Sequence, residues 1–354
     1  MKPYTLIFLL GCSSAFPFSG MAQKSPVRST GVWTLSGRLQ LQHVYHAGIP
    51  SDAARINQGF RIRRGRLVVK ANASEFIQVL FQIEARDNKP RLKDAAGTVH
   101  LANGFYVRFG QFKVPVWREE LRSSGKLLLI ERSPVASYLA GLNLSARQIG
   151  LEIGKRSANG LHWVLNLSNG AGEGQREDAG RSKSDLFLNN GKLFTARLEA
   201  RPRNRLALGI SAALNQVGTR IGATDATGTI RAILPDFHLA LPVGANQSLD
   251  IEGGLGWGKI SGNLADGQEK TFVLLETTAR WQQALRHPSR TLAGLDAVEF
   301  AAGYAMIHDL RTVSVFRFGP GLRFGKAMRL QVNAEIESGS EDAFKVRSQV
   351  MFNF

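Results

Sequence analysis

Apolar and polar residues alternate at every second position along most of this chain, and this period of two restricts its fold more than any other feature. In 193–201, LFTARLEAR, Phe194 and Leu198 fall on one face, whereas Arg197 and Glu199 fall on the other. The same pattern recurs in 33–45, 328–337 and 344–354. A helix would group apolar residues at three- and four-residue spacing, so the alternation predicts β-strands.

The connections between the expected strands differ in length at the two ends. We expect about 16 strands, which begin near residues 32, 57, 75, 92, 104, 145, 160, 192, 204, 228, 246, 269, 296, 311, 328 and 343. Many connections are tight turns: 72–74, 102–104, 158–160, 202–204 and 325–327. Others are long: 46–56, 114–144, 170–191, 216–227 and 258–268, and 283–295 is long where a short turn is expected. Short turns at one end and long loops at the other are typical of an all-β, antiparallel outer-membrane barrel. The alternative is a secreted soluble β-sandwich or barrel.

The first residues have the pattern of an export signal. Lys2, a short apolar stretch and a small-residue site that ends at Ala22 predict a signal peptide over 1–22, which leaves 23–354 as the barrel. A lipoprotein site at Cys12 is the competing interpretation. Later in the chain, no apolar stretch reaches the ~18 residues that a membrane-spanning helix needs.

The chain is strongly basic, with 45 Lys and Arg against 28 Asp and Glu, a formal net charge of +17. Such a balance suggests an anionic partner: nucleic acid, an anionic membrane surface or small anions. A Lys or Arg that faces lipid at the bilayer midplane costs ~2–4 kcal/mol, so arginines at alternate strand positions are expected to face the lumen. The pore wall is therefore predicted to be basic.

The stretch GFRIRRGRLVVK, 59–70, carries five cations: Arg61, Arg63, Arg64, Arg66 and Lys70. Strict alternation cannot put Arg63 and Arg64 on one face, so one of them is expected at a bulge or at a membrane interface. Guanidinium groups clustered in a pore could bind phosphate or carboxylate oxygens in bidentate fashion. A solvated strand end is the other interpretation.

The alternation stops in 110–133, GQFKVPVWREELRSSGKLLLIERS. Pro115 removes a ladder donor and should end a strand, and REELRSSG predicts a helical turn or two that Gly125 closes. We expect the loop 114–141 to fold inward, because irregular backbone is tolerated at membrane depth where it lines water. Lys113, Arg118, Arg122, Lys126 and Arg132 would then put cations at a constriction, with Glu119, Glu120 and Glu131 as their partners or as solubilising groups.

Several of these motifs together resemble the porin O and P family of phosphate- and pyrophosphate-selective outer-membrane porins. The resemblance rests on RRGRL (63–67), RLKDA (91–95), GQFKVPVWREEL (110–121), IERS (130–133) and Phe354, and is strongest over 59–133. It implies a 16-stranded trimeric barrel with an inward third loop and a basic permeation path. By position, Arg63 and Arg64 match the family's strand-two arginine pair, and Lys113 and Arg132 its constriction. AGTVH after RLKDA departs from the pattern and puts the fourth strand in doubt.

Other motifs favour a structural interpretation. GGLGWGKI (253–260) nearly spells a phosphate-binding loop, but Ile260 stands where Ser or Thr should bind magnesium. The alternation of Gly254, Gly256 and Gly258 instead suits a crowded strand face. We find no nucleophile elbow and no metal-ligand spacing, and we expect neither an enzyme nor a cofactor.

The function predicted from the sequence is passive diffusion of small anions, phosphate or a phosphate-like oxyanion, across the outer membrane of a Gram-negative bacterium. The expected partners are these anions, outer-membrane lipid and two further copies in a homotrimer, without nucleic acid. The alternatives are a weakly selective porin and, from other classes, a membrane-barrel hydrolase or a polyanion-binding surface protein. The predicted anion-binding residues are Arg63, Arg64, Arg66, Lys113 and Arg132, together with a row expected on five strands, Arg38, Arg197, Arg317, Arg323 and Arg347.

Overall fold

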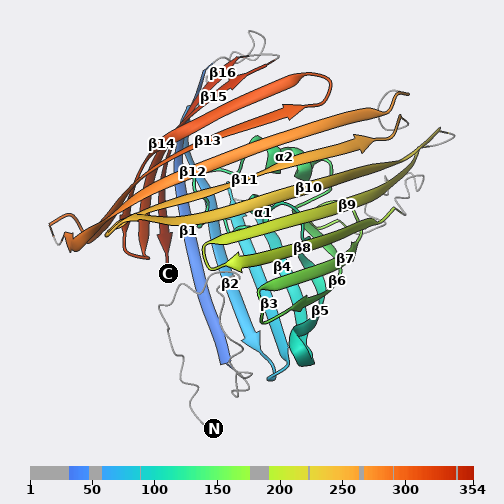
Figure 1. Cartoon of the computed structure of the whole chain (residues 1–354), viewed down its shortest axis with the longest axis horizontal. Coiled ribbons are helices and arrows are strands. Elements are labelled where there is room, and N and C mark those ends of the chain that lie inside the picture. The colour runs from blue at the N-terminus through green and yellow to red at the C-terminus, as the bar shows by residue number, and fades with distance from the viewer. Residues whose placement is uncertain are drawn as a thin grey trace.

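The chain forms a closed antiparallel β-barrel in which each strand pairs with its neighbours in sequence and the first pairs with the sixteenth (Figure 1). The computed structural model describes residues 32–47, 58–87, 89–175, 191–221, 224–262, 267–289, 291–339 and 342–354. The predicted signal peptide, its site at Ala22 and Cys12 lie outside these residues. The fold class predicted from the alternation is confirmed.

The sixteen strands described correspond one to one to the expected segments. They are β1 Val32–Ala47, β2 Gly59–Asn72, β3 Ile77–Arg86, β4 Lys89–His100, β5 Phe105–Lys113, β6 Arg147–Arg156, β7 Leu161–Ser168, β8 Leu193–Arg203, β9 Leu206–Ile221, β10 Thr224–Gly244, β11 Gln247–Ile260, β12 Lys270–Ser289, β13 Leu295–His308, β14 Thr312–Phe324, β15 Met328–Ser338 and β16 Ala343–Asn353. The helical elements described are η2 Ala102–Gly104, α1 Arg118–Leu121 and α2 Pro134–Gly141.

Two doubts about the strands are resolved by the pairing. The fourth strand forms despite AGTVH, and Ala95 to Val99 pair with both β3 and β5. The long connection expected at 283–295 is wrong, because β12 continues to Ser289 and resumes pairing with β13 after a register shift. β12 therefore contains a bulge, and the only sign of it in the sequence is a loss of alternation.

Alternation gives the barrel two chemically different faces. In β8, Phe194 and Leu198 are 44% and 46% exposed, whereas Arg197 and Glu199 are 4% and 2% exposed. The exposed apolar face is the outer face, and the buried polar face, here called the inner face, surrounds the barrel axis. None of the helices among the described residues could span a membrane.

The barrel closes at a seam between β1 and β16. Ten residue pairs join these strands, from Arg38 with Asn353 to Ala47 with Phe344. Beyond the ladder, the Gly37 amide donates to the Phe354 carbonyl at 2.6 Å, and the Phe354 amide donates back at 3.1 Å. A Cβ atom on residue 37 would collide with the Phe354 ring, so glycine is required there for this approach.

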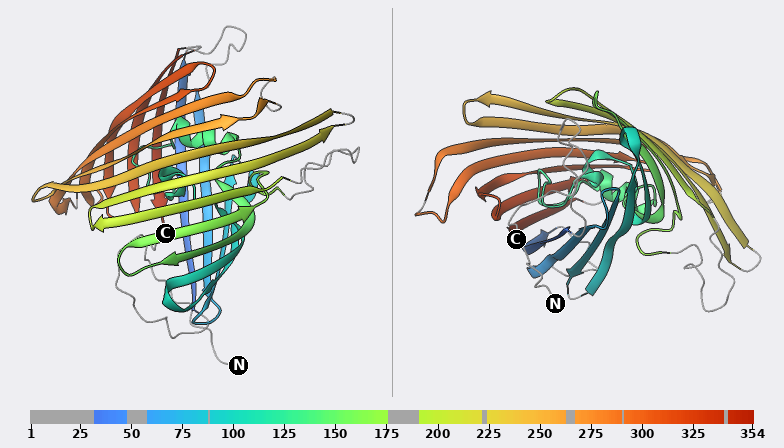
Figure 2. Two further views of the ribbon diagram at one scale, coloured as in Figure 1. Left: turned by 45° about the vertical axis from the view of Figure 1, so that its right-hand side comes forward. Right: turned by 90° about the horizontal axis from the view of Figure 1, so that it is seen from below.

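The wall is uneven in height. β10 and β12 have 21 and 20 residues, whereas β5 has 9 and β7 has 8. In the view from below, the strands form a curved wall, and α1 and α2 lie within its curve (Figure 2). Both helices belong to residues 114–146, which connect β5 to β6 and are called the β5–β6 segment below.

Candidate functional site

The β5–β6 segment begins where Pro115 interrupts the ladder. The Val114 amide still donates to the Ala146 carbonyl at 2.9 Å, and the chain then turns at Trp117, which has a φ of 64°. Such a backbone is strained for a bulky residue and persists only where its surroundings fix it. The Trp117 ring is 1% exposed, donates from Nε1 to Glu276 at 2.9 Å and occupies the space that a Cβ on Gly254 would need. The predicted helix of one or two turns is the single turn α1, which ends at Leu121 rather than at Gly125.

Helix α2 packs on an apolar part of the inner face. Ser133 caps its N-terminus by accepting from the Ala136 amide at 3.1 Å, and Pro134 occupies the first turn. Its buried side chains join an apolar cluster that includes Val135, Leu139, Leu144, Leu234, Phe272 and Leu274. Gly256 and Gly258 leave room for the same wall side chains, as expected of a crowded strand face. Sequence reasoning missed this cluster, although the unbroken apolar run 272–275 could have indicated a strand that is apolar on both faces.

Two carboxylates from opposite sides meet at Ser133. Its amide donates to Glu119 at 2.7 Å, and its hydroxyl forms a short hydrogen bond with Glu276 of β12. Since Glu276 also accepts from Trp117, one wall carboxylate holds both α1 and the start of α2. These contacts fix the segment to β12.

Two segment arginines reach wall carboxylates farther around the barrel. Arg118 donates to Asp236 of β10 at 2.9 Å and to Glu199 of β8 at 3.0 Å. Arg122 pairs with Glu252 of β11. With the contacts of Ser133, these ion pairs connect the segment to β8, β10, β11 and β12.

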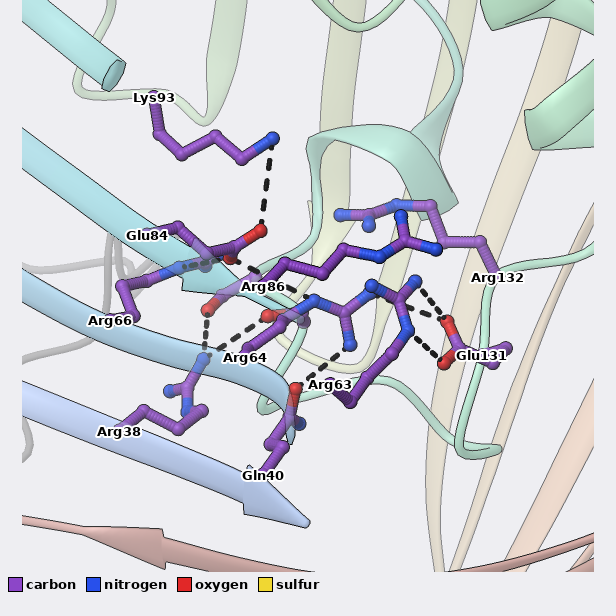
Figure 3. A network of polar contacts seen from close by, with 12 residues as sticks. Arg38, Gln40, Arg63, Arg64, Arg66, Glu84, Arg86, Lys93, Glu131 and Arg132 are labelled. Atoms are coloured by element: carbon purple, nitrogen blue, oxygen red, sulfur yellow. Dashed lines mark hydrogen bonds and ion pairs between the residues drawn. The ribbon is translucent and has the colours of Figure 1, made fainter. Parts of the chain in front are cut away.

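A β-bulge places both strand-two arginines on the inner face. Gln40 of β1 pairs with Arg64, but Leu41 pairs with Ile62, which leaves Arg63 as the extra residue. Arg64 donates to Gln40 at 2.8 Å, and both arginines point toward the β5–β6 segment (Figure 3). Of the two placements expected for the adjacent arginines, a bulge or a membrane interface, the structure has the bulge.

The segment supplies the carboxylate that these arginines bind. Arg63 donates to the two Glu131 oxygens at 2.5 and 2.8 Å, and Arg64 donates to one of them at 3.3 Å. Burial alone would raise the pKa of Glu131, but the guanidinium groups of Arg64 and Arg63 outweigh it and hold this pKa well below its usual range. Glu131 therefore stays ionised in mild acid.

A second bulge, next to the first, adds Lys93 to the inner face. Gln82 of β3 pairs with Asp94, and Ile83 pairs with Leu92, so Lys93 is the extra residue. Lys93 lies 3.7 Å from Glu84 and 2.7 Å from Glu173. Arg66 binds the same Glu84, which makes this carboxylate the bridge between the two bulged strands.

Lys113 and Arg132 hold the backbone of the segment. Lys113 donates to the carbonyls of Glu120 and Arg122, the latter at 2.9 Å. Arg132 donates to the same two carbonyls at 3.2 and 2.8 Å, and its Nε lies 2.7 Å from the Glu120 carboxylate. Figure 3 shows Arg132 beside Arg63 and Arg64, so these three predicted residues are brought together.

The row of five further arginines is spread around the wall. Arg317 and Arg323 both belong to β14, so the row comes from four strands rather than the five expected. The partners found are Asn353, Ser123 and Ser124 for Arg38; Asp236, Glu199 and Ser211 for Arg197; the Glu131 carbonyl for Arg317; Gln282 for Arg323; and Glu335 for Arg347.

A cavity of about 980 Å³ lies inside the barrel, between the β5–β6 segment and the short turns. Five of the ten predicted anion-binding residues line it: Arg38, Arg66, Lys113, Arg197 and Arg323. Among the described residues that line this cavity, seventeen are Lys or Arg and only four are Asp or Glu. The surface of the cavity is therefore strongly cationic.

Several carboxylates that pair with arginines are less exposed than the arginines that they bind. The side chains of Glu84, Asp236, Glu199, Glu252 and Glu299 are 5% exposed or less, whereas those of Arg66, Arg118, Arg122 and Arg280 are 10–19% exposed. Asp250 and Glu335, at 20% and 12%, are exceptions. Bidentate and charge-assisted hydrogen bonds fix the orientation of a guanidinium group. At these pairs the wall presents held arginines to the cavity, and most of the acids that hold them are less exposed than the guanidinium groups.

The comparison with known proteins decides the family. A family described as phosphate-selective porin O and P matches residues 40–216, which is half of the chain and includes the strand-two arginines and the whole β5–β6 segment. The chain belongs to this porin family. No curated protein matched the porin.

Several solved structures share the fold of the porin at low sequence identity. An anion-selective porin from Comamonas acidovorans is 12% identical, with a TM-score of 0.60 over 92% of this chain and 100% of that one. The outer membrane channel DcaP of Acinetobacter baumannii is 11% identical, with a TM-score of 0.58 over 94% and 100%. OmpT, an outer membrane protein of Vibrio cholerae in trimer form, is 10% identical, with a TM-score of 0.60 over 92% and 100%.

Family and fold together establish the broad role. The chain is an outer-membrane porin of Gram-negative type, and therefore a channel rather than an enzyme.

Proposed function

We propose that this porin conducts small anions by passive diffusion and favours phosphate or a phosphate-like oxyanion. The observation that carries the proposal is the excess of seventeen cations over four carboxylates among the described residues that line the cavity. The family description supports an oxyanion as the preferred ion.

The pairing of the arginines suits conduction better than a bare cluster would. One unpaired arginine attracts a unit charge at 4 Å by ~4 kcal/mol at an effective dielectric constant of ~20, and several acting on one ion would trap it. The buried carboxylates reduce this attraction while they keep the N–H groups aimed at the cavity. A row of moderate sites lets an anion both bind and leave.

The β5–β6 segment supplies the constriction in this proposal. A 16-strand barrel leaves an aqueous lumen that is too wide to select ions without an inserted element. We infer that the segment folds inward and narrows the path, with Arg63, Arg64, Arg66, Lys113 and Arg132 at the narrowest level. Its ion pairs with β8, β10 and β11 support this position. The row Arg38, Arg197, Arg317, Arg323 and Arg347 would extend the cationic path along the wall.

The porin is further proposed to act as a homotrimer in outer-membrane lipid. The resemblance of its motifs to a trimeric family supports three copies, and the OmpT structure of similar fold is a trimer. Chemical cross-linking in mild detergent should give a trimer band.

Planar-bilayer recording tests the proposed selectivity. Under a potassium chloride gradient, the reversal potential should take the sign of chloride permeation, and added inorganic phosphate should reduce the chloride current in a saturable manner. Cation selectivity, or the absence of channels from correctly folded protein, would refute the anion channel.

The dense ion pairing also favours one alternative, a weakly selective porin in which arginines and wall carboxylates compensate each other. In that case only size would discriminate. A chloride current that is insensitive to millimolar phosphate would decide for this alternative.

A further inference from the structure

Glu131 makes the contacts that a bound oxyanion would make. Its carboxylate accepts two hydrogen bonds from Arg63, one from Arg64 and one from the Gln42 amide at 2.9 Å. Arg64 and Gln42 are 4% and 2% exposed, so half of this donor set is fixed in the wall. A carboxylate presents planar oxygens to a guanidinium fork as a phosphate or sulfate does.

Contacts of Glu131 and of its two neighbours in sequence hold its carboxylate in this position. Arg317 donates from Nη1 to the Glu131 carbonyl at 3.0 Å, and the Ile130 amide donates to Asn333 at 2.7 Å. On the other side, Arg132 is held by Glu120. A group on so short a tether has a high effective concentration at its site, and a free anion must compete with it.

Glu131 differs from the nearest wall carboxylate, Glu84, in the element that carries it and in its exposure. Glu84, which binds Arg66 and lies 3.9 Å from Arg64, belongs to β3 and has a side chain that is 5% exposed, whereas the Glu131 side chain belongs to the segment and is 19% exposed. It approaches Arg63 and Arg64 from the side of the segment rather than from beneath. If Glu131 swings away, Arg64 keeps its hydrogen bond to Gln40, whereas Arg63 loses both of its hydrogen bonds to Glu131.

We propose that Glu131 is a tethered competitor for the anion site formed by Arg63, Arg64 and Gln42, and so sets which anions bind there. The inference rests on the proposed function. An incoming anion displaces the carboxylate, binds the two guanidinium groups and is expelled when the carboxylate returns. Divalent oxyanions, with more charge and more acceptor oxygens, displace it more readily than chloride does. Glu131 thereby lowers the affinity of the site for anions and speeds their release.

The test is the half-blocking phosphate concentration for chloride current in planar bilayers. If the carboxylate occupies the site for about nine-tenths of the time, Glu131→Gln should lower this concentration about tenfold. It should also lower the current at saturating phosphate, because the bound ion leaves more slowly. Glu131→Asp keeps the charge on a shorter arm and should fall between the two.

Glu337→Gln is the matched control, because it removes an equal charge from an inner-face ion pair, with Lys345 at 2.9 Å, on another strand. Its half-blocking concentration should equal that of the wild type. A weaker or unchanged block in Glu131→Gln, with wild-type electrophoretic mobility of the folded barrel, would show that Glu131 only supports the arginines and would overturn the inference. If wild-type current is itself insensitive to phosphate, the proposed function fails instead, and the two failures are distinct.

Discussion

The apolar docking of α2 predicts that one leucine controls whether the β5–β6 segment stays in place. Leu139 is completely buried among Leu234, Phe272 and Leu274. Replacing a buried leucine by alanine costs ~2–5 kcal/mol. An eight-residue helix has almost no stability of its own, so this loss should fall on the docking of α2 and not on the strands.

The expected magnitude follows from the free-energy scale. Since ~1.4 kcal/mol is a factor of ten in an equilibrium constant, Leu139→Ala should raise the population of undocked α2 by roughly 30-fold to several thousandfold. Amide hydrogen exchange in α2 should accelerate by the same factor, whereas exchange in β12 and β13 should not change. Ser137→Ala alters an exposed position of the same helix and should shift docking by less than about 0.5 kcal/mol.

Two results would contradict this reasoning. Unchanged exchange in α2 would mean that the apolar cluster does not position the helix. Equal acceleration in α2 and in β12 and β13 would mean that the cluster stabilises the wall itself, and that segment and barrel unfold together.

Three further outcomes are expected. Arg132→Gln should weaken phosphate block and lower anion preference with the barrel intact, whereas Lys345→Gln should not; equal effects of the two would remove Arg132 from the constriction. Gly256→Ala should lower the urea midpoint of unfolding by the equivalent of ~1–3 kcal/mol, because a Cβ there meets Leu234 and Leu274 side-chain carbons at 2.8–3.0 Å, whereas Gly97→Ala enters open space. The Glu131 ion pairs contribute stability above the ordinary glutamate pKa of ~4.3 and lose it only below that value, because the folded pKa is lowered; the carboxyl carbon of Glu131 should therefore show no NMR titration from about pH 8 to about pH 5, and titration within that range would contradict the pairing.

Strand identity and order could be predicted because lipid and a polar interior impose opposite requirements on successive residues. The alternation of apolar and polar residues located the starts of β8 and β15 within a few residues. The adjacent Arg63 and Arg64 indicated a bulge as one of two possible placements. Each of these signals is local, because the residue types at neighbouring positions of one strand are enough to predict the feature.

The pairing of charges across the barrel could not be predicted in this way. Glu131 lies 68 residues from Arg63, and Trp117 lies 159 residues from Glu276. Which of several acids meets which arginine depends on the path of the β5–β6 segment across the inner face. The alternation of apolar and polar residues does not predict that path. It also did not predict the apolar surface on which α2 docks, because it assigns polar residues to every inward position.

The seam between β1 and β16 has a consequence for how the porin is made. Arg38 and Asn353, which meet there through a side-chain hydrogen bond, are 315 positions apart in sequence. Until β16 arrives, β1 and every intermediate sheet present an unpaired edge, which invites pairing with other chains. Contacts between residues this distant in sequence also form slowly, because the chain must first lose the conformational entropy of the long loop between them. Biogenesis therefore requires that a nearly complete chain be kept from aggregating before it can become a membrane protein, and removal of β16 should produce aggregates rather than a smaller pore.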